Sequence, residues 1–434
     1  MRPAADSRWT RPVAFGGRAS AAPRGEPLEV GRVVSDVAGA LTPAEAQAFL
    51  QQVGERHGRP PRSGPGQANP YSRMRSVAED EPRAQLRPVV ELDHLQAVVN
   101  GHPPSVGAVE VTYEGVLAAA ETIAPHLPPT PAWSFPLLDE VAGVSVVVKH
   151  ENVQPTGAFK VRGGVNLALS LGADELEAGL VTASTGNHAQ SVSYGARLVG
   201  ATAVIVVPES APPSKVAAVR ALGGEVVVHG PTMDEAVEEA KRLAGERGLR
   251  YVDPGNEPAI VHGHATVYLE LLQRHPELEA VYVPVGSGTG ASGACVVREV
   301  LAPVCRVVAV QSSAAPAAYQ AFRAGRPAQA PCRTRSSGLA TGTSYALPQR
   351  VLADRLDDFV LVDDDDLDAA AALLASHAHT LAESAGAAAL AALLADPDRP
   401  QRCAVVVTGG NASADEIRAL AAGPPTPEWS RRRT

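Results

Sequence analysis

The sequence predicts an α/β fold with mainly parallel sheets from about residue 105 onward. Apolar, β-branched runs alternate there with helical stretches rich in alanine and leucine, as in successive βαβ units. The apolar runs are continuous rather than alternating, which is typical of strands that helices cover on both faces. We therefore expect ligands at the loops that follow the strands, where open parallel sheets bind them.

The elements follow from these runs in chain order. The expected strands are 144–149, 180–182, 203–207, 225–229, 280–284, 306–311 and 404–407. The expected helices between them include 163–170, 189–198, 214–222 and 233–247.

Composition narrows the class of protein. The chain has 434 residues, 45% of them hydrophobic and 20% charged, as in an ordinary globular protein. Its net charge of −9 argues against a nucleic-acid binder, which needs a basic surface. No apolar run is long enough for a membrane span, and no secretory signal is evident. The four cysteines show neither disulfide nor zinc spacing and are interpreted as buried thiols of a cytoplasmic protein.

Residues 1–104 differ from the rest of the chain. Their segments rich in proline, glycine and arginine cannot bury enough apolar surface to order themselves. A short helix is expected near residues 42–53, with Thr42 as its cap, Pro43 in its first turn and Glu45 at capping-box distance. We interpret 1–104 as a partly disordered N-terminal extension and 426–434 as a tail.

The first unusual loop contains Phe159, Lys160, Gly163 and Gly164. A lysine at a helix start is unfavourably placed for the helix dipole. If it is desolvated, its pKa falls and it can act as an amine nucleophile or base. The alternative to a reactive amine is a lysine that simply faces solvent.

The second loop, residues 182–188, follows an apolar strand. Its small and polar residues place backbone N–H groups and hydroxyls at a helix N-terminus, an arrangement suited to a carboxylate or phosphate. Helix capping by Ser184 or Thr185 is the simpler alternative.

The third loop, residues 283–293, matches the dinucleotide fingerprint as Gly288-x-Gly290-x-x-Gly293. The acidic residue that binds the ribose should end the next strand, where Gln311 stands instead. A phosphate cradle is favoured over a Rossmann dehydrogenase for this reason. A plain tight turn is the remaining alternative.

The fourth loop runs from a strand into Thr408, Gly409, Gly410 and Asn411. A hydroxyl at a strand end can donate to a ring nitrogen or cap the next helix. His262 and His264 flank a glycine without any supporting cysteine or carboxylate cluster, so they are interpreted as structural rather than as metal ligands.

Taken together and in this order, the four loops resemble those of the fold-type II pyridoxal-phosphate enzymes, in the tryptophan synthase β-like superfamily. The threonine/serine dehydratase and serine racemase group is the nearest likeness. It covers roughly residues 108–415 and extends to further short segments. These are 112–120, 130–131, 208–210, 214–215, 317–319, 337–340 and 383–388.

The resemblance implies pyridoxal 5′-phosphate as cofactor and a role for each loop. Lys160 would hold the cofactor covalently and act as the base at Cα, with Thr185 as a second catalytic hydroxyl. Asn187 would bind the cofactor's 3′-oxygen, Thr408 would face its ring nitrogen and Phe159 would pack beside the ring. The turn of Gly286, Ser287, Gly288, Thr289 and Gly290 would hold its phosphate, and Ser184, Thr185, Gly186 and His188 would surround the substrate carboxylate.

Several residues depart from the family pattern. Ala158 stands where a serine is common, and Ser287 and Thr289 replace glycines of the phosphate turn. Gln311 stands where racemases have a metal-binding glutamate, so no metal is expected. Ser337 replaces a usual aspartate near the site entrance.

The resemblance also implies a domain organisation and a function. A large cofactor-binding domain would comprise 105–171 and 259–425, and a small domain 172–258. The leading hypothesis is a lyase that eliminates water from a hydroxy-amino acid such as threonine or serine, releasing a 2-oxo acid and ammonia. The alternatives are β-replacement or racemisation in specialised metabolism, and a non-catalytic ligand-binding protein. A homodimer with an amino-acid substrate, and no nucleic-acid or membrane partner, is expected.

Overall fold

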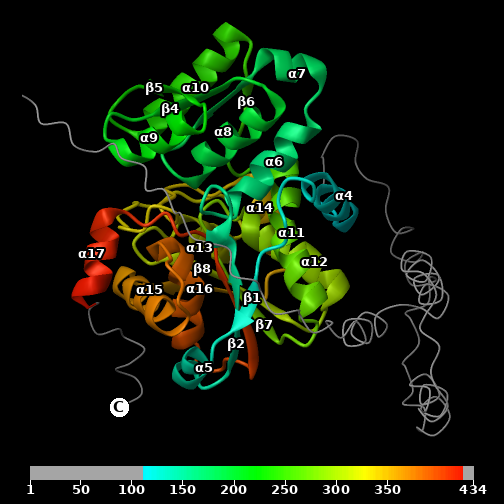
Figure 1. Ribbon diagram of the computed structural model, residues 1–434, viewed down its shortest axis with the longest axis vertical. Coiled ribbons are helices and arrows are strands. Elements are labelled where there is room, and N and C mark those ends of the chain that lie inside the picture. Colours follow the sequence, from blue (N-terminus) through cyan, green and yellow to red (C-terminus); the bar gives the residue numbers. More distant parts are fainter. Residues whose placement is uncertain (1–110, 424–434) are drawn as a thin grey trace, which may run out of the picture. The chain divides into compact units, whose positions relative to one another are not determined.

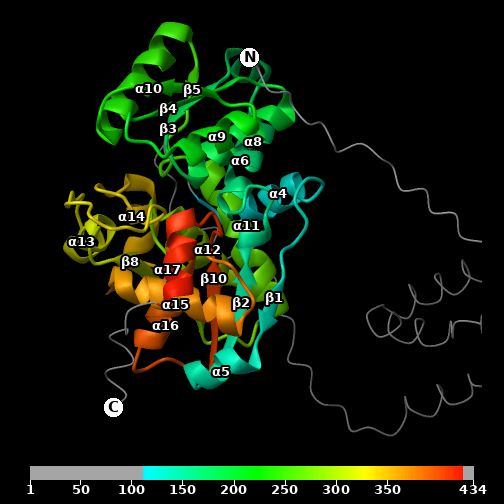
Figure 2. The same ribbon diagram turned by 60° about the vertical axis from the view of Figure 1, so that its left-hand side comes forward.

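A computed structural model describes residues 111–423, which carry two β-sheets and their helices (Figure 1). The helix expected near 42–53 and the tail 426–434 lie outside the described residues. In both views the four-stranded sheet and α10 lie at one end, and the six-stranded sheet with α15 and α16 lies at the other (Figure 2). No helix in the described part of the chain is long and apolar enough to cross a bilayer.

The larger sheet has the strand order β1-β2-β10-β7-β8-β9. Its strands are parallel except β1, which runs antiparallel to β2 at one edge. The carboxyl ends of β2, β10 and β7 therefore lie side by side. The strands are β1 (Ala132–Ser134), β2 (Ser145–His150), β7 (Ala280–Pro284), β8 (Arg306–Ser312), β9 (Asp358–Val362) and β10 (Arg402–Val407).

Helices cover this sheet on both faces because successive side chains of each strand point to opposite sides. Along β7, Val281 and Val283 join one core with α4, α11 and α12, whereas Ala280 and Tyr282 join another with α5, α15 and α16. The helices are α4 (Tyr113–Ile123), α5 (Pro136–Ala142), α11 (Pro258–Arg274), α12 (Thr289–Leu301), α13 (Ala317–Ala324), α14 (Ala346–Ala353), α15 (Asp364–His377), α16 (Ser384–Ala395) and α17 (Ala414–Ala422).

The smaller sheet is entirely parallel, in the order β5-β4-β3-β6. Helix α10 packs on one face, while α8 and α9 pack on the other with the C-terminal half of α6. The elements are α6 (Lys160–Ser170), α7 (Ala173–Ala178), β3 (Leu180–Ala183), α8 (Asn187–Val199), β4 (Ala203–Val207), α9 (Pro213–Ala221), β5 (Glu225–Val228), α10 (Met233–Arg247) and β6 (Arg250–Tyr251).

The α/β fold class is confirmed, and each of the seven expected strands coincides with an observed one. The helix over Met233–Arg247 has the predicted bounds. Strands β1 and β6 were not predicted. They contain only three and two residues, which is too few to show a periodic pattern of hydrophobicity. Strand β9, a sheet edge, was also not predicted. The division into large and small domains stays a prediction, since Pro104–Thr434 groups as one compact unit.

Helix α6 lies unusually close to α8 and α11, because glycines stand at both contacts. A Cβ atom on Gly164 would come within 2.3 Å of the Ser191 carbonyl oxygen, and one on Gly195 within 2.3 Å of the Gly164 carbonyl oxygen. On the other side, a Cβ on Gly263 would lie 2.5 Å from the Arg162 carbonyl oxygen. Any larger residue would push α6 away from its neighbours.

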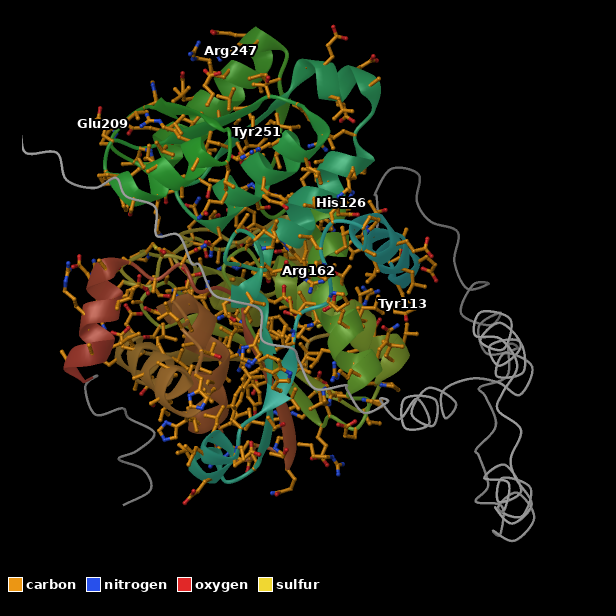
Figure 3. The ribbon with its side chains drawn as sticks, viewed as in Figure 1. Tyr113, His126, Arg162, Glu209, Arg247 and Tyr251 are labelled. Atoms are coloured by element: carbon orange, nitrogen blue, oxygen red, sulfur yellow. The ribbon has the colours of Figure 1, made fainter. Side chains whose placement is uncertain are left out.

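A buried cluster of four charged residues holds the first turn of α6. Arg162 bonds to Glu151 in η2 (Glu151–Val153) at 2.7 Å and to Glu270 in α11 at 2.6 Å. Lys149 in β2 completes the cluster with a 2.5 Å bond to Glu270. Figure 3 labels Arg162 in the interior, unlike Glu209 and Arg247 at the rim. Burial alone would raise the pKa of Glu151, but the charge and hydrogen bonds of Arg162 outweigh it and lower that pKa.

We expect Arg162→Met to destabilise the fold by about 3–5 kcal/mol, because it leaves two buried or half-buried carboxylates without their main partner. Urea unfolding followed by circular dichroism measures the change. The matched control is Arg242→Met, which removes an exposed arginine from α10. Equal midpoints for the two variants would contradict the role given to the buried cluster.

Candidate active site

The four loops singled out in the sequence meet around one cavity of about 200 Å³. Every residue predicted for the site lines it, and Lys215, Ser337, Tyr345 and Glu383 add to its wall. The convergence follows from the sheets. Loops after β2, β7 and β10 come from neighbouring strands of the larger sheet, and the loop after β3 comes from the smaller one.

Lys160 begins α6, directly after a segment that is tied to the end of β10. The Phe159 N–H donates to the Thr408 carbonyl oxygen at 2.9 Å, and Ala158 pairs with Gly409. The Lys160 Nζ lies 3.4 Å from Ser287 Oγ and 3.3 Å from Thr289 Oγ1, with the Phe159 ring at 5.0 Å. Burial lowers the pKa of this amine to about 8. The alternative of a solvent-facing lysine is therefore excluded.

The loop after β7 presents a row of unused backbone donors. None of the N–H groups from Gly286 to Gly290 bonds to any residue between 111 and 423, and they stand at the N-terminus of α12. Gly288 has a φ of +92°, in the region that favours glycine. A Cβ on Gly286 would lie 2.6 Å from the Gly338 carbonyl oxygen. These orphaned donors fit a phosphate group.

The hydroxyls that replace glycines in this loop join Lys160 to a buried histidine. Thr289 Oγ1 lies 3.0 Å from His264 Nδ1 and 3.2 Å from Ser287 Oγ. The other ring nitrogen of His264 faces the Lys160 carbonyl oxygen at 3.4 Å. Burial and the nearby Lys160 charge lower the pKa of His264 well below its usual value, so the ring is neutral. The structural interpretation of His264 missed this link to the site.

The loop after β3 offers a second group of free donors. The N–H groups of Thr185, Asn187 and His188 have no acceptor among the described residues, and they lie at the start of α8. The His188 ring turns inward, with Nε2 3.1 Å from Thr182 Oγ1. Burial and Lys160 lower its pKa to about 3, so it stays neutral. The loop can thus bind a carboxylate through backbone N–H groups rather than through an imidazolium charge.

Asn187 is held by two residues to which the sequence analysis gave no role. Its Nδ2 donates to Glu383 Oε1 at 2.6 Å, and its Oδ1 accepts from Asn411 Nδ2 at 2.8 Å. The second N–H of that amide stays available to a cofactor oxygen. Burial raises the pKa of Glu383. A lone carboxyl within a run of alanines was the only sequence signal for Glu383.

Thr408 directly follows β10, with its side chain at the cavity wall. No described residue hydrogen-bonds its hydroxyl, which leaves it available to a ring nitrogen. Gln311 is occupied by protein groups, since its Nε2 donates to Thr341 Oγ1 and its Oε1 accepts from the Tyr319 N–H. Residues 111–423 hold no group of three or more His, Cys, Asp or Glu side chains that could bind a metal.

Free backbone donors, an unbonded hydroxyl on Thr408 and the Lys160 amine, all around one cavity, fit a phosphorylated aldehyde cofactor. A family profile described as pyridoxal-phosphate dependent enzyme matches residues 123–409, and the chain belongs to that family. The site residues fit pyridoxal 5′-phosphate by their free donors and their spacing around Lys160.

Individual relatives agree with this assignment. An L-threonine ammonia-lyase of Thermotoga maritima is 34% identical over 309 residues, which is 71% of this chain and 77% of the relative. A beta-hydroxyaspartate dehydratase of Paracoccus denitrificans is 34% identical, over 70% of this chain and 98% of the relative. The structure of maize serine racemase superposes with a TM-score of 0.68 at 30% identity, covering 73% of this chain and 98% of the racemase.

We expect the Lys160 amine to titrate near pH 8 in cofactor-free protein, rather than near the 10.5 of an ordinary lysine. Because burial disfavours the ammonium form, the free amine already predominates above pH 8. The rate of modification by trinitrobenzenesulfonate, followed for the Lys160 peptide by mass spectrometry, measures the midpoint. The exposed Lys241 in the same digests is the internal control. A Lys160 midpoint above pH 10 would contradict the desolvation argument.

Proposed function

We propose that this chain is a pyridoxal-phosphate-dependent ammonia-lyase that acts on a β-hydroxy amino acid such as threonine or serine. It would convert the substrate into a 2-oxo acid and ammonia. The observation that carries the proposal is the buried Lys160 amine, whose pKa is about 8 and which lies among three cofactor- and anion-binding loops. The named activity of the Thermotoga relative supports the same reaction.

The chain's residues divide the work between binding and proton transfer. The N–H groups of Gly286–Gly290 would hold the phosphate, and Asn187 and Thr408 would orient the ring. The donors at the start of α8 would hold the substrate carboxylate, which places the Cα–H bond beside Lys160. The Lys160 amine removes that proton and Ser287 and Thr289 accept hydrogen bonds from the resulting ammonium. The bound cofactor supplies the electron sink for the negative charge at Cα.

The identity of Thr408 bears on which reaction follows. Thr408 would offer a hydroxyl rather than a carboxylate to the ring nitrogen of the cofactor, which would leave that nitrogen largely unprotonated. The cofactor would then supply a weaker electron sink, which favours prompt loss of a β-leaving group. Elimination is therefore the reaction that a threonine at position 408 favours.

Racemisation is the second candidate. It needs a second proton-transfer group, and the Thr185 hydroxyl lines the cavity without a described hydrogen-bond partner. The similarity to maize serine racemase supports the same candidate. The products distinguish racemisation from elimination, because racemisation releases no ammonia.

A cytoplasmic homodimer is also part of the proposal. Cys295, Cys305 and Cys403 are buried and unpaired, which suits a reducing compartment. The expectation of a buried thiol is wrong for Cys332, which is exposed. Several large apolar side chains are exposed near the β1 edge, among them Trp133, Leu137 and Val153. Light scattering of the purified chain tests the oligomeric state.

We expect the purified protein to show a visible absorbance band that shifts when L-serine or L-threonine is added. Lys160→Ala should lose the band and lower ammonia release by about 10³-fold or more, because it removes both the covalent anchor and the base. Absorbance spectra and a coupled assay for ammonia and 2-oxo acid measure the two effects.

The control for the lysine variant is Lys241→Ala, on the exposed face of α10. A colourless wild-type protein that takes up no added cofactor would contradict the catalytic assignment. Formation of a D-amino acid without ammonia would support racemisation in place of elimination.

A further inference from the structure

A second lysine lines the cavity, and the reaction described above gives it no role. Lys215 lies in the first turn of α9, on the smaller sheet. Its Nζ donates to the Ser337 Oγ at 2.7 Å, across to the segment that precedes α14. None of the ion pairs in the described part of the chain includes Lys215. Its hydrogen-bond partner is therefore a neutral hydroxyl, and the Glu383 carboxyl interacts with its charge without a direct ion pair.

The remaining ionisable groups of the cavity do not balance this charge. The lining holds two amines, Lys160 and Lys215, and a single carboxyl, Glu383. Glu383 is bonded to Asn187, and burial raises its pKa even though that hydrogen bond and the charge of Lys215 act in the opposite direction. His188 is neutral, and burial raises the pKa of Tyr345 to about 12, so its phenol is neutral too. The lining of the cavity thus holds one more amine than carboxyl.

The anions already assigned to the site have other partners. The phosphate would take the backbone donors of Gly286–Gly290 at the start of α12, and the substrate α-carboxylate would take those at the start of α8. Lys215 stands on a third helix, so neither anion is assigned to it. A third anionic group, carried by the substrate's own side chain, would complete the charge balance.

We propose that Lys215 and Ser337 form a subsite for a carboxylate on the substrate's β-carbon. The preferred substrate is then a β-hydroxy amino dicarboxylic acid, with 3-hydroxyaspartate as the simplest member. This inference rests on the proposed function, since it names the substrate class of the same site. Lys215 acts in it as a specificity-determining residue.

The chemistry of the pair suits a carboxylate. A lysine ammonium bonds a carboxylate more strongly than a neutral hydroxyl, because the bond is charge-assisted. The Ser337 hydroxyl both donates and accepts, so it can turn from Lys215 to the same carboxylate. Ser337 is exposed and Lys215 half-buried, which moderates the gain through solvent screening. We therefore expect discrimination of about 10- to 100-fold, below that of a fully buried site.

The reaction on this substrate balances without a further reagent. The Cα–H bond and the Cβ–O bond break, and the hydroxyl leaves as water with one proton. The product enamine takes up a proton at Cβ, and one water then hydrolyses its imine form. The net products are 2-oxosuccinate and ammonia.

The test compares four substrates with the holoenzyme: L-threo- and L-erythro-3-hydroxyaspartate, L-serine and L-threonine. The better hydroxyaspartate isomer should exceed L-serine in kcat/KM by about 10-fold or more. Lys215→Gln should lower the ratio of the two kcat/KM values by about 10- to 100-fold. Lys241→Gln, on α10, should leave the ratio unchanged.

A second variant separates charge from packing. Ser337→Asp keeps Lys215 but supplies it with an internal carboxylate, so it should lower the same ratio although the lysine remains. A binding measurement avoids turnover altogether. L-Aspartate, which has no β-leaving group, should bind the holoenzyme about 10-fold more tightly than its neutral isostere L-asparagine, and Lys215→Gln should remove the difference.

The outcomes distinguish this inference from the function on which it rests. Ammonia release from serine or threonine, with no preference for hydroxyaspartate and no effect of Lys215→Gln on the ratio, would overturn the subsite and leave the lyase standing. Cofactor binding without ammonia release from any of the four substrates would overturn the lyase itself. A dicarboxylate preference that survives both variants would also overturn the role of Lys215.

Discussion

The buried charge cluster around Arg162 is the constraint on which the site depends. It joins η2, α6 and α11 at one point, two residues after Lys160, the lysine that we propose as the base. Because Arg162 and Glu151 are fully buried, neither can move without leaving an uncompensated charge in the interior. Helix α6 is therefore held in rotation and in position, and the glycines at its contacts with α8 and α11 let those helices approach closely. These contacts therefore fix the position of Lys160 at the start of α6.

The free donors that the site offers to anions are chiefly backbone N–H groups. Free N–H groups at the starts of α8 and α12 provide fixed partial charges that do not titrate. The histidines nearby, His188 and His264, are neutral because they are buried. Lys160 can consequently exchange protons near neutral pH while the anion sites stay unchanged. The hydroxyls of Ser287 and Thr289 provide its hydrogen-bond partners without a competing negative charge.

The local sequence was enough to predict the four loops, because each loop follows a strongly apolar strand and contains residues that suit a helix start. Lys160, Thr185, Thr408 and the glycine turn could all be selected in this way, and all line the cavity. Glu383 and Lys215 lie in segments that carry the resemblance but received no role, since each looks locally like an ordinary helix-end residue. His264 was interpreted as structural, because its partner Thr289 lies 25 positions further along the chain.

The sequence by itself determined the parallel α/β architecture, the order of the loops and the identity of the lysine. These features depend on short-range patterns of apolar and small residues, which can be recognised in the sequence without a structure. Only the tertiary structure decided which charges meet. The lowered pKa of Lys160, the neutrality of His188 and the pairing of Lys215 with the Ser337 hydroxyl all depend on burial and on partners from distant segments. Electrostatic free energies depend on the distance between charges and on solvent access, and neither quantity can be derived from the order of residues alone.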